Sequence, residues 1–535
     1  MVKDIQRWLD SRQYSPQMLA TARLVLADVQ RGAIFQKAVR HHPLPQGGYV
    51  PKHAVIEAYR QLVSLGEWED DPALLASIRM KPMRTLSGVT IVTVLTKPFA
   101  CPGKCIFCPV DLQMPKSYLP DEPGASRAVQ NEFDPYRQVK SRLDSYLAVG
   151  HPIDKIELLI LGGTWSVYPA DYQEWFIQRC FDAMNGCDSR SLQEAQTANE
   201  TTASRNVGLV IETRPEYITP PELRRLRQLG VTKIQLGAQS LDDHVLELNQ
   251  RGHTTADTLR ATSLLRRAGF KIVLHWMPNL LGSSLEMDPL DFSRLWSGGY
   301  APDELKIYPV QLLQNSELYN IWLKGDYHPY STAELVSLLA DIKPTIPPYC
   351  RVNRVIRDIP STHVVAGNKR TSLRQDILAE IQHRGQVCGC VRCHEVSDRK
   401  VTLKELKLED FVYHPEGGTE HFLSFRTPEN RIAGYLRLVL PGKEQSLDSS
   451  NGFPDLEKSA IIREVHVYGQ ALAVGGEQPG AAQHIGLGTR LMDRALEISR
   501  EKGYARLAVI SAIGTRLYYQ SRGFQRGELY MFKEI

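Results

Sequence analysis

The sequence has no long apolar run, few cysteines and little net charge. Its 535 residues contain no apolar stretch long enough to cross a bilayer, and the charged start lacks the features of a cleavable signal. These absences predict a soluble, cytoplasmic protein with no membrane partner. In that compartment cysteines are typical of metal or redox sites rather than of disulfides, so the placing of the nine cysteines is informative.

The formal net charge of +4 is small, but the basic residues gather in two regions. Residues 1–90 contain twelve Lys and Arg against eight Asp and Glu, and residues 350–400 contain ten against five. Two basic regions on a near-neutral chain indicate a polyanionic partner. An ordinary solvated surface is the alternative that charge alone leaves open.

The hydrophobic pattern predicts four regions. They are a basic helical region at 1–85, alternating strands and helices at 86–345, a basic linker at 346–410, and a smaller α/β unit at 411–535. Six apolar strands in the second region predict a parallel sheet covered by helices. Six β/α repeats are too few for a closed eightfold barrel, so we expect a partial, open barrel. A polar stretch at 186–206 is predicted to be a surface insertion.

The segment "CPGKCIFCP" directly follows the first predicted strand, where α/β barrels carry their chemistry. Thiolates suit zinc or iron–sulfur clusters, and three of them leave one iron of a four-iron cluster with an open coordination position. A structural zinc site with a distant fourth ligand is the alternative. Gly103 is expected to let the loop turn tightly. The predicted ligands are Cys101, Cys105 and Cys108.

The spacing C-x3-C-x2-C after the first strand of such a repeat resembles the radical S-adenosylmethionine (SAM) superfamily. The resemblance implies a [4Fe–4S] cluster whose open iron is chelated by the amino and carboxylate groups of SAM. Polar residues at the later strand ends fit such a site, although each could simply cap its loop. The predicted cofactor-binding residues are Gly162, Gly163, Thr164, Glu212, Arg214, Gln235, Gln239 and Ser240, and the catalytic candidate is His275.

The segment "QHIGLGTRLMDRALEISREKG", residues 483–503, runs from a glycine-rich turn into an amphipathic helix. Backbone N–H groups at a helix start can bind an anion, and glycines allow a pyrophosphate to approach closely. With the strand "REVHVYG" before it and "LYYQSRGF" after it, the segment resembles the GNAT acetyltransferases, which implies acetyl-CoA binding. The predicted contacts are Glu464, Val465, His466, Val467, Gly486, Leu487, Gly488 and Thr489.

In the resemblance to GNAT acetyltransferases, a tyrosine faces the thioester. Tyr518 or Tyr519 takes that position, and the other tyrosine is expected to fill space in the core. By analogy with the family, Lys155 contacts acetyl-CoA; a solvated lysine at a strand start is the alternative.

A radical SAM barrel joined to a GNAT unit resembles the family of the catalytic subunit of Elongator over essentially the whole chain. The resemblance implies that a carboxymethyl group is added to C5 of the wobble uridine of tRNA, with acetyl-CoA as carbon source. It also implies the tRNA anticodon stem–loop and an electron donor as partners, and leaves a homodimer or accessory subunits open. Cleaving a C–H bond of an acetyl methyl group needs a radical, whereas amine acetylation needs no cluster. The alternatives are a protein (histone) lysine acetyltransferase with a structural barrel, and a tRNA-binding scaffold.

A second cysteine group, "CGCVRC", lies in the basic linker. Three thiolates so close together usually share one ion, and tetrahedral zinc is the commonest. Cys350 is the preferred fourth ligand, with His383 and His394 as alternatives. The predicted zinc ligands are therefore Cys388, Cys390, Cys393 and Cys350.

Phosphates of a bound tRNA must lie beside the barrel mouth, and the two basic regions offer the surface for them. We expect contacts to the tRNA backbone with little sequence preference. Alternatively, these side chains pair with acidic residues between domains. The predicted contacts are Arg79, Lys81, Arg84, Arg351, Arg354 and Arg357.

Overall fold

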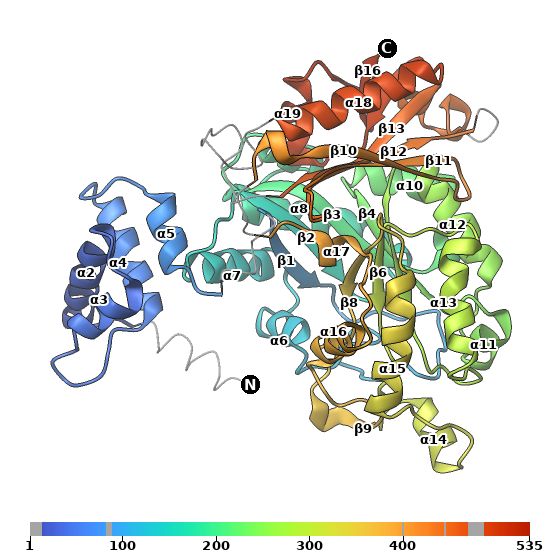
Figure 1. Ribbon diagram of the computed structural model, residues 1–535, viewed down its shortest axis with the longest axis horizontal. Coiled ribbons are helices and arrows are strands. Elements are labelled where there is room, and N and C mark those ends of the chain that lie inside the picture. The colour runs from blue at the N-terminus through green and yellow to red at the C-terminus, as the bar shows by residue number, and fades with distance from the viewer. Residues whose placement is uncertain (1–12, 82–87, 398–400, 443–445, 469–485) are drawn as a thin grey trace.

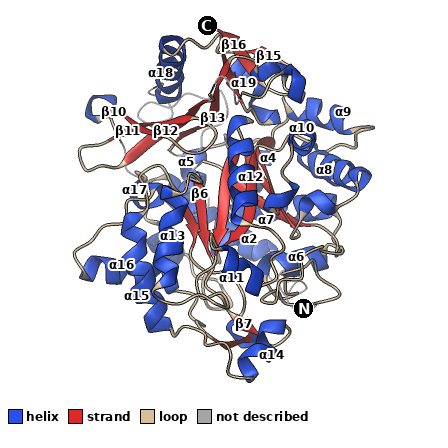
Figure 2. Cartoon of the chain, turned by 90° about the vertical axis from the view of Figure 1, so that its right-hand side faces the viewer, coloured by secondary structure: helices blue, strands red, loops and turns tan. Residues whose placement is uncertain are grey.

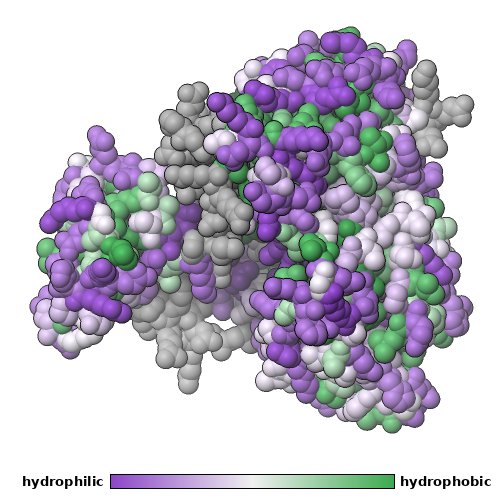
Figure 3. Space-filling view, in the orientation of Figure 1, coloured by the Kyte–Doolittle hydropathy of each residue, from purple (hydrophilic) through white to green (hydrophobic). Residues whose placement is uncertain are grey.

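The computed structural model describes residues 13–81, 88–397, 401–442, 446–468 and 486–535. A helical unit lies to one side, and a parallel sheet and a second, mixed sheet form the rest of the molecule (Figure 1). Most of the surface in the same view is hydrophilic (Figure 3). Among the described helices, none is long and apolar enough to span a membrane.

The N-terminal unit is a helical bundle with its own apolar core. Its helices are α2 (Pro16–Gln30), α3 (Phe35–His41), α4 (Lys52–Ser64) and α5 (Pro72–Ile78). Val25, Ile56 and Tyr59 are buried in a cluster that is separate from the main core. The bundle is joined to the barrel where the amide of Met80 donates to the carbonyl of Val149, at 3.1 Å.

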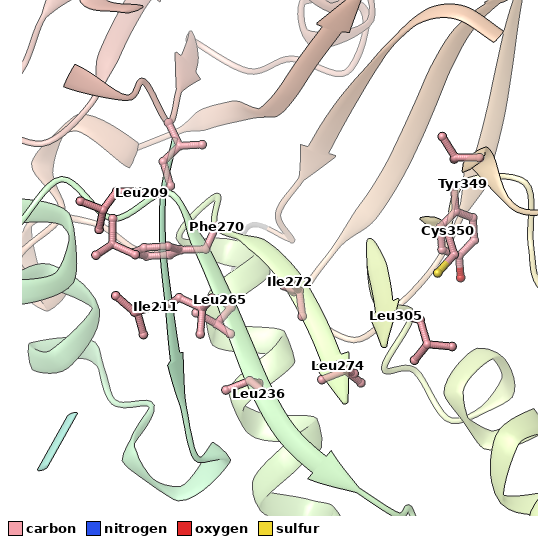
Figure 4. Packing of buried hydrophobic residues seen from close by; sticks show 14 of the residues in the cluster. Leu209, Ile211, Leu236, Leu265, Phe270, Ile272, Leu274, Leu305, Tyr349 and Cys350 are labelled. Atoms are coloured by element: carbon pink, nitrogen blue, oxygen red, sulfur yellow. The ribbon is translucent and has the colours of Figure 1, made fainter. Parts of the chain in front are cut away.

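Seven parallel strands form an open, curled sheet in the order β1-β2-β3-β4-β5-β6-β8. This confirms the predicted partial barrel. Helices cover its outer face, and Leu236, Leu265 and Ile272 pack between the two layers (Figure 4). The strands are β1 (Thr90–Leu95), β2 (Lys155–Leu161), β3 (Arg205–Thr213), β4 (Lys233–Gln239), β5 (Lys271–Trp276), β6 (Glu304–Ile307) and β8 (Arg351–Arg354).

One or two helices follow most of the barrel strands, and α16 (Leu373–His383) and α17 (Val391–His394) follow the last of them. The other helices are α6 (Pro123–Gln130), α7 (Pro135–Leu147), α8 (Ala170–Asn185), α9 (Leu192–Asn199), α10 (Pro220–Gln228), α11 (Asp243–Leu248), α12 (Thr255–Arg267), α13 (Met287–Ser297), α14 (Glu317–Leu323) and α15 (Thr332–Ile342). A short pair of strands, β7 (Leu312–Leu313) and β9 (Val364–Ala366), lies below the barrel (Figures 1 and 2).

Two expectations from the sequence differ from the structure. The polar stretch at 186–206 is not a loose insertion, because it contains α9, whose Leu192 and Ala195 are buried in the core. The prediction of six strands missed β8, which pairs in parallel with β6. Its four residues, RVNR, are too short and too polar to give an apolar strand signal.

The C-terminal unit is a seven-stranded, mixed sheet in the order β10-β11-β12-β13-β14-β16-β15. Its strands are β10 (Lys407–Tyr413), β11 (Thr419–Arg426), β12 (Ile432–Leu440), β13 (Ser459–Val467), β14 (Arg506–Val509), β15 (Gln525–Arg526) and β16 (Met531–Glu534), and its helices are α18 (Leu487–Glu501) and α19 (Arg516–Gln520). β14 pairs in parallel with β13 only along Ser459–Ile462. The two strands therefore separate before β13 ends.

The C-terminal sheet lies against the amino ends of the barrel strands (Figure 1). Lys271 begins β5 and pairs with Glu464 of β13, and Asp303 precedes β6 and pairs with Arg463. The carboxyl ends of the barrel strands, which carry the cysteine loop, lie at the opposite end of the barrel.

Candidate functional site: a cavity through the barrel

A single cavity of about 1180 Å³ connects the cysteine loop with the C-terminal sheet. Cys101, Cys105 and Cys108 line one part of it, and Glu464 to Tyr468 line another. Residues along the whole length of the barrel strands form its walls. In β2, for example, both the first residue, Lys155, and the last, Leu161, line the cavity. The two sites predicted from the sequence thus open into one space.

The cysteine loop is held by hydrogen bonds to its sulfur atoms. Arg251 Nη1 donates to Cys105 Sγ at 3.1 Å, and the amide of Gly103 donates to Cys101 Sγ at 3.4 Å. The hydrogen bond from Cys108, then the positive charges of Arg251 and Arg214, lower the pKa of Cys105 to about 4 although burial opposes them. A low thiol pKa favours the thiolate form, which is the form that binds metal.

Gly103 serves a different purpose from the tight turn that the sequence suggested. Its φ is not in the left-handed region, but a Cβ there would come within 2.2 Å of Arg214 Nη1. The glycine leaves room for the guanidinium of Arg214.

On the rim, Glu212 organises the glycines that follow β2. It accepts hydrogen bonds from the amides of Gly162 and Gly163, at 2.9 and 2.8 Å, and from the hydroxyl of Tyr118, at 2.7 Å. A Cβ at Gly162 would overlap Thr96 Oγ1, so only glycine fits. Thr164 Oγ1 lies 3.9 Å from Cys101 Sγ.

The other predicted rim residues divide into those that face the cavity and one that does not. His275 Nε2 lies 3.0 Å from Gln235 Oε1, and burial, with Lys306 nearby, lowers the pKa of His275 well below its usual value. Gln239 also lines the cavity, and its buried Oε1 has no hydrogen-bond partner among the described residues. Ser240 instead donates to Asp291 outside the cavity lining, at 3.1 Å.

Charged side chains inside the barrel were missed from the sequence. Lys233 Nζ lies 2.8 Å from Glu157 Oε2, and Lys271 Nζ lies 2.6 Å from Glu304 Oε1. Barrel interiors are usually filled by apolar side chains, so these ion pairs mark an unusually polar lumen. The one sequence signal for these ion pairs is that both β4 and β5 begin with a lysine. A lysine at a strand start is normally solvated, and only the curl of the sheet turns these two into the barrel.

At the C-terminal end of the cavity, β13 presents Glu464 and His466. Glu464 accepts a hydrogen bond from Arg437 Nε at 2.9 Å and pairs with Lys271. Burial lowers the pKa of His466 to about 4, and in the part of the chain that the structure describes its Nε2 has no hydrogen-bond partner. Lys155 lines the cavity too, and burial lowers its pKa.

The start of α18 is close to one of the two candidate tyrosines. Gly486 is in the left-handed region, with a φ of 71°, and caps the helix. A Cβ at Gly488 would lie 3.0 Å from the Tyr518 hydroxyl and 3.9 Å from Val467. Tyr519 instead lines the cavity and packs in the core beside Phe524. Leu487 is buried, and Thr489 is in the first turn of α18.

The second cysteine group forms a candidate metal centre of three ligands. No described histidine, carboxylate or further cysteine completes it within the same 4.8 Å group, and Cys350 is buried outside that group. His383 is exposed, and His394 Nδ1 lies 3.2 Å from the carbonyl of Cys390. The fully buried Lys343 donates to Cys388 Sγ at 3.4 Å. The grouped sulfurs are those of Cys388, Cys390 and Cys393.

The arginines predicted to bind tRNA have acidic partners within the protein. Arg351 pairs with Glu395 and Arg357 with Glu122, at 2.9 and 3.0 Å, and both arginines are largely buried. Arg354 is about half exposed and pairs with Asp358. All three line the cavity.

The N-terminal group of predicted tRNA contacts is described in part. Arg79 Nε donates to the carbonyl of Gly150 at 2.9 Å, and Lys81 is exposed. Arg84 lies outside the described residues.

An open parallel barrel with three cysteines on the loop after its first strand, all lining one cavity, is the arrangement of a radical SAM protein. The radical SAM superfamily matches residues 97–288, and the radical SAM C-terminal domain matches residues 302–383. The site fits a cluster, because three sulfurs open into one cavity and two guanidinium groups lie against Cys105.

Comparison with known proteins identifies the family more closely. The chain is 42% identical to the tRNA uridine(34) acetyltransferase of Dehalococcoides mccartyi, over 85% of this chain and 99% of the relative. It is 35% identical to Elongator complex protein 3 of Homo sapiens, over 86% and 87%. The solved structure of Methanocaldococcus infernus Elp3 with an N-terminal deletion matches with a TM-score of 0.72 and 35% identity, over 84% of this chain and all of that one. The chain belongs to the family of the tRNA uridine(34) acetyltransferases and Elongator complex protein 3, and it is a radical SAM enzyme.

Proposed function

We propose that this enzyme adds a carboxymethyl group to C5 of the wobble uridine of tRNA, using acetyl-CoA and SAM. The observation that carries the proposal is the single cavity, which joins the three-thiolate loop to the separated end of β13. A protein that used only one of the two cofactors would have no need of this connection. The relatives named for uridine(34) of tRNA supply the substrate class.

The cysteine end of the cavity would hold the cluster and SAM. Cys101, Cys105 and Cys108 would ligate a [4Fe–4S] cluster, and the rim around Glu212 and Gln239 would surround SAM. When bound, these groups would supply the 5′-deoxyadenosyl radical chemistry by which the acetyl methyl group loses a hydrogen atom and its carbon replaces the hydrogen on C5. Arg214 and Arg251 keep positive charge beside the thiolates.

The other end of the cavity would hold acetyl-CoA. Beyond Ile462, β13 pairs with no β14 residue among those described, and Val465 lines the cavity, so this stretch of β13 is the candidate place for a pantetheine arm. The amides at the start of α18, near Gly486 and Gly488, would bind the pyrophosphate. Tyr518 and Tyr519 are the candidates for the hydroxyl beside the thioester, whose hydrolysis releases coenzyme A and leaves the carboxylate.

The remaining parts of the proposal concern regions and partners. The N-terminal helical bundle and the arginines in and just after β8 would contact the tRNA anticodon stem–loop. The group at 388–393 would hold zinc between the barrel, whose last strand β8 ends at Arg354, and the acetyl-CoA unit, which begins with β10. The proposal includes an electron donor for the cluster and a cytoplasmic reaction, and leaves open a homodimer or accessory subunits.

The decisive experiment is to incubate anaerobically reconstituted enzyme with tRNA, SAM, acetyl-CoA and dithionite, and then to analyse the nucleosides by mass spectrometry. We expect carboxymethyluridine and 5′-deoxyadenosine, both dependent on SAM. Acetylated lysine on protein, formed at the same rate without SAM, would instead support a protein acetyltransferase with a structural barrel.

A further inference from the structure

Two guanidinium groups converge on the sulfur of one of the three predicted cluster ligands. Arg251 Nη1 lies 3.1 Å and Arg214 Nη1 lies 3.8 Å from Cys105 Sγ. Both arginines are buried, with 5% of their surface exposed, and Arg214 also donates to the carbonyl of Arg251. Cys101, by contrast, receives an amide hydrogen bond and lies near a hydroxyl.

Arg251 lacks a carboxylate partner. Arg214 pairs with Glu216, whereas no carboxylate in the described part of the chain lies within ion-pair distance of Arg251. Its other hydrogen bond goes to the carbonyl of Gly237. A buried cation is costly unless an opposite charge compensates it, and the thiolate of Cys105 is the group in contact with it.

Two glycines keep space for this arrangement. A Cβ at Gly103 would come within 2.2 Å of Arg214 Nη1, and a Cβ at Gly237 would come within 3.0 Å of Arg251 Nη2. Neither glycine has a φ in the left-handed region. Gly103 therefore leaves room for Arg214, and Gly237 leaves room for Arg251 and for Gln239, whose Nε2 would be nearer, at 2.8 Å; neither glycine is needed for a left-handed turn.

We propose that Arg251, assisted by Arg214, raises the reduction potential of the cluster by donating hydrogen bonds and positive charge to the thiolate of Cys105. One-electron reduction makes the cluster and its thiolates more negative. A nearby cation and N–H donors stabilise that state more than the oxidised one, and the low dielectric of a buried site strengthens the effect. Arg251 is thus a positioning and tuning residue that makes reduction by a low-potential electron donor easier. The inference rests on the cluster of the proposed function.

The test compares midpoint potentials of full-length, reconstituted proteins without SAM, so that altered SAM binding cannot cause a shift. The variants are Arg251→Gln, Arg251→Lys and Lys104→Gln, with iron content and the electron paramagnetic resonance of the reduced cluster as readouts. Lys104→Gln is the matched control, because it removes a positive charge from the same loop at an exposed side chain, where solvent screens it. We expect Arg251→Gln to lower the ratio of reduced to oxidised cluster at least tenfold at a fixed potential. For one electron, this change equals a decrease of about 59 mV in the midpoint potential. Arg251→Lys should retain part of the wild-type potential, and Lys104→Gln nearly all of it.

An unchanged midpoint in Arg251→Gln with wild-type iron content would overturn the inference, as would an equal shift in Lys104→Gln. If Arg251→Gln cannot hold iron, Arg214→Gln and Arg251→Lys carry the comparison, and an unchanged midpoint in both would overturn it equally. A wild-type protein that binds no iron would refute the cluster of the proposed function itself, a result that iron content separates from a failure of the tuning alone.

Discussion

Arg463 of β13 and Asp303, just before β6, form an ion pair in which both side chains are completely buried. Arg463 Nη1 lies 3.0 Å from Asp303 Oδ1, and the same guanidinium pairs with Glu420 of β11. The pair joins the C-terminal sheet to the amino ends of the barrel strands. It therefore fixes the position of the predicted acetyl-CoA site relative to the cavity.

Removing one partner of this pair should destabilise the protein strongly. Asp303→Ala would leave the buried guanidiniums of Arg463 and Arg437 short of one compensating charge, although Glu420 still pairs with Arg463, at a cost of about 3–5 kcal/mol in the free energy of unfolding. The exposed pair Arg506–Glu534 is the control, and Glu534→Gln should cost less than about 1 kcal/mol. Urea unfolding of the three proteins measures the difference; similar losses in both variants would contradict the structural role.

The same pair predicts a pH dependence. Burial opposes ionisation of Asp303, but Arg463 and Arg437 lower its pKa below the usual value. For a carboxyl group with a lowered folded pKa, the stabilisation is present above the unfolded pKa of about 3.9 and is lost as the pH falls through the folded value. The stability gap between wild type and Asp303→Asn should therefore be constant from pH 7 to about 5 and shrink below about pH 4. A gap that widens on acidification would contradict this sign.

Replacing the three cysteines of the first loop should abolish SAM cleavage. A variant with Ser at all three positions has no thiolates for a cluster, so we expect no bound iron and no 5′-deoxyadenosine. Acetyl-CoA binding should persist, because its predicted site lies at the other end of the cavity. Formation of 5′-deoxyadenosine at the wild-type rate would refute the cluster assignment. The ligands concerned are Cys101, Cys105 and Cys108.

Gly488→Val should block acetyl-CoA. A Cβ at this position lies 3.0 Å from the Tyr518 hydroxyl, so the branched side chain would crowd the start of α18. We expect acetyl-CoA hydrolysis to be lost and tRNA affinity to be kept, and Gly486→Val should add the strain of a positive φ. Asp493→Val, at an exposed position further along α18, is the control. Undiminished hydrolysis in Gly488→Val would remove the argument for this loop.

Charge reversal should show which basic residues contact tRNA. Arg354→Glu and Lys81→Glu change the exposed members of the two groups, whereas Arg351 and Arg357 are held by internal pairs. Each reversal should weaken binding to all tRNA sequences alike. It should also reduce the slope of the logarithm of affinity against the logarithm of salt concentration by about 1. Lys407→Glu, on the exposed edge strand β10, is the control. Unchanged affinity and slope in both variants would refute the tRNA placement without touching the chemistry.

Cys390→Ser should remove the second metal. The three sulfurs lie within 4.8 Å of one another, and Lys343 favours their negative charge. We expect zinc content to fall and thermal stability to drop, with iron in the first loop unchanged. Cys187→Ser is the control, because Cys187 is exposed and ungrouped. Full zinc occupancy in Cys390→Ser would contradict the centre.

The sequence by itself determined the features that depend on local pattern. The C-x3-C-x2-C loop, the six apolar strands and the glycine-rich start of α18 are short segments whose residue types and spacing carry the information. They predicted which strands, loops and helices would carry the two candidate sites. The fold class followed, because alternating apolar strands and amphipathic helices leave few arrangements other than a parallel sheet covered by helices.

Only the tertiary structure decided what depends on residues far apart in the chain. Arg251 and Cys105 are 146 residues apart, and nothing near either one in the sequence shows that the guanidinium meets the sulfur. The polar strand β8 gave no apolar signal, since its pairing with β6 and not its composition makes it a strand. From the sequence, Lys271 is expected to be a solvated lysine at a strand start. In the structure it faces the inside of the curled sheet and pairs with Glu464 of the C-terminal unit. The physical reason is common to all three: periodicity reports which face of an element is buried, whereas charge compensation depends on which elements the fold brings together.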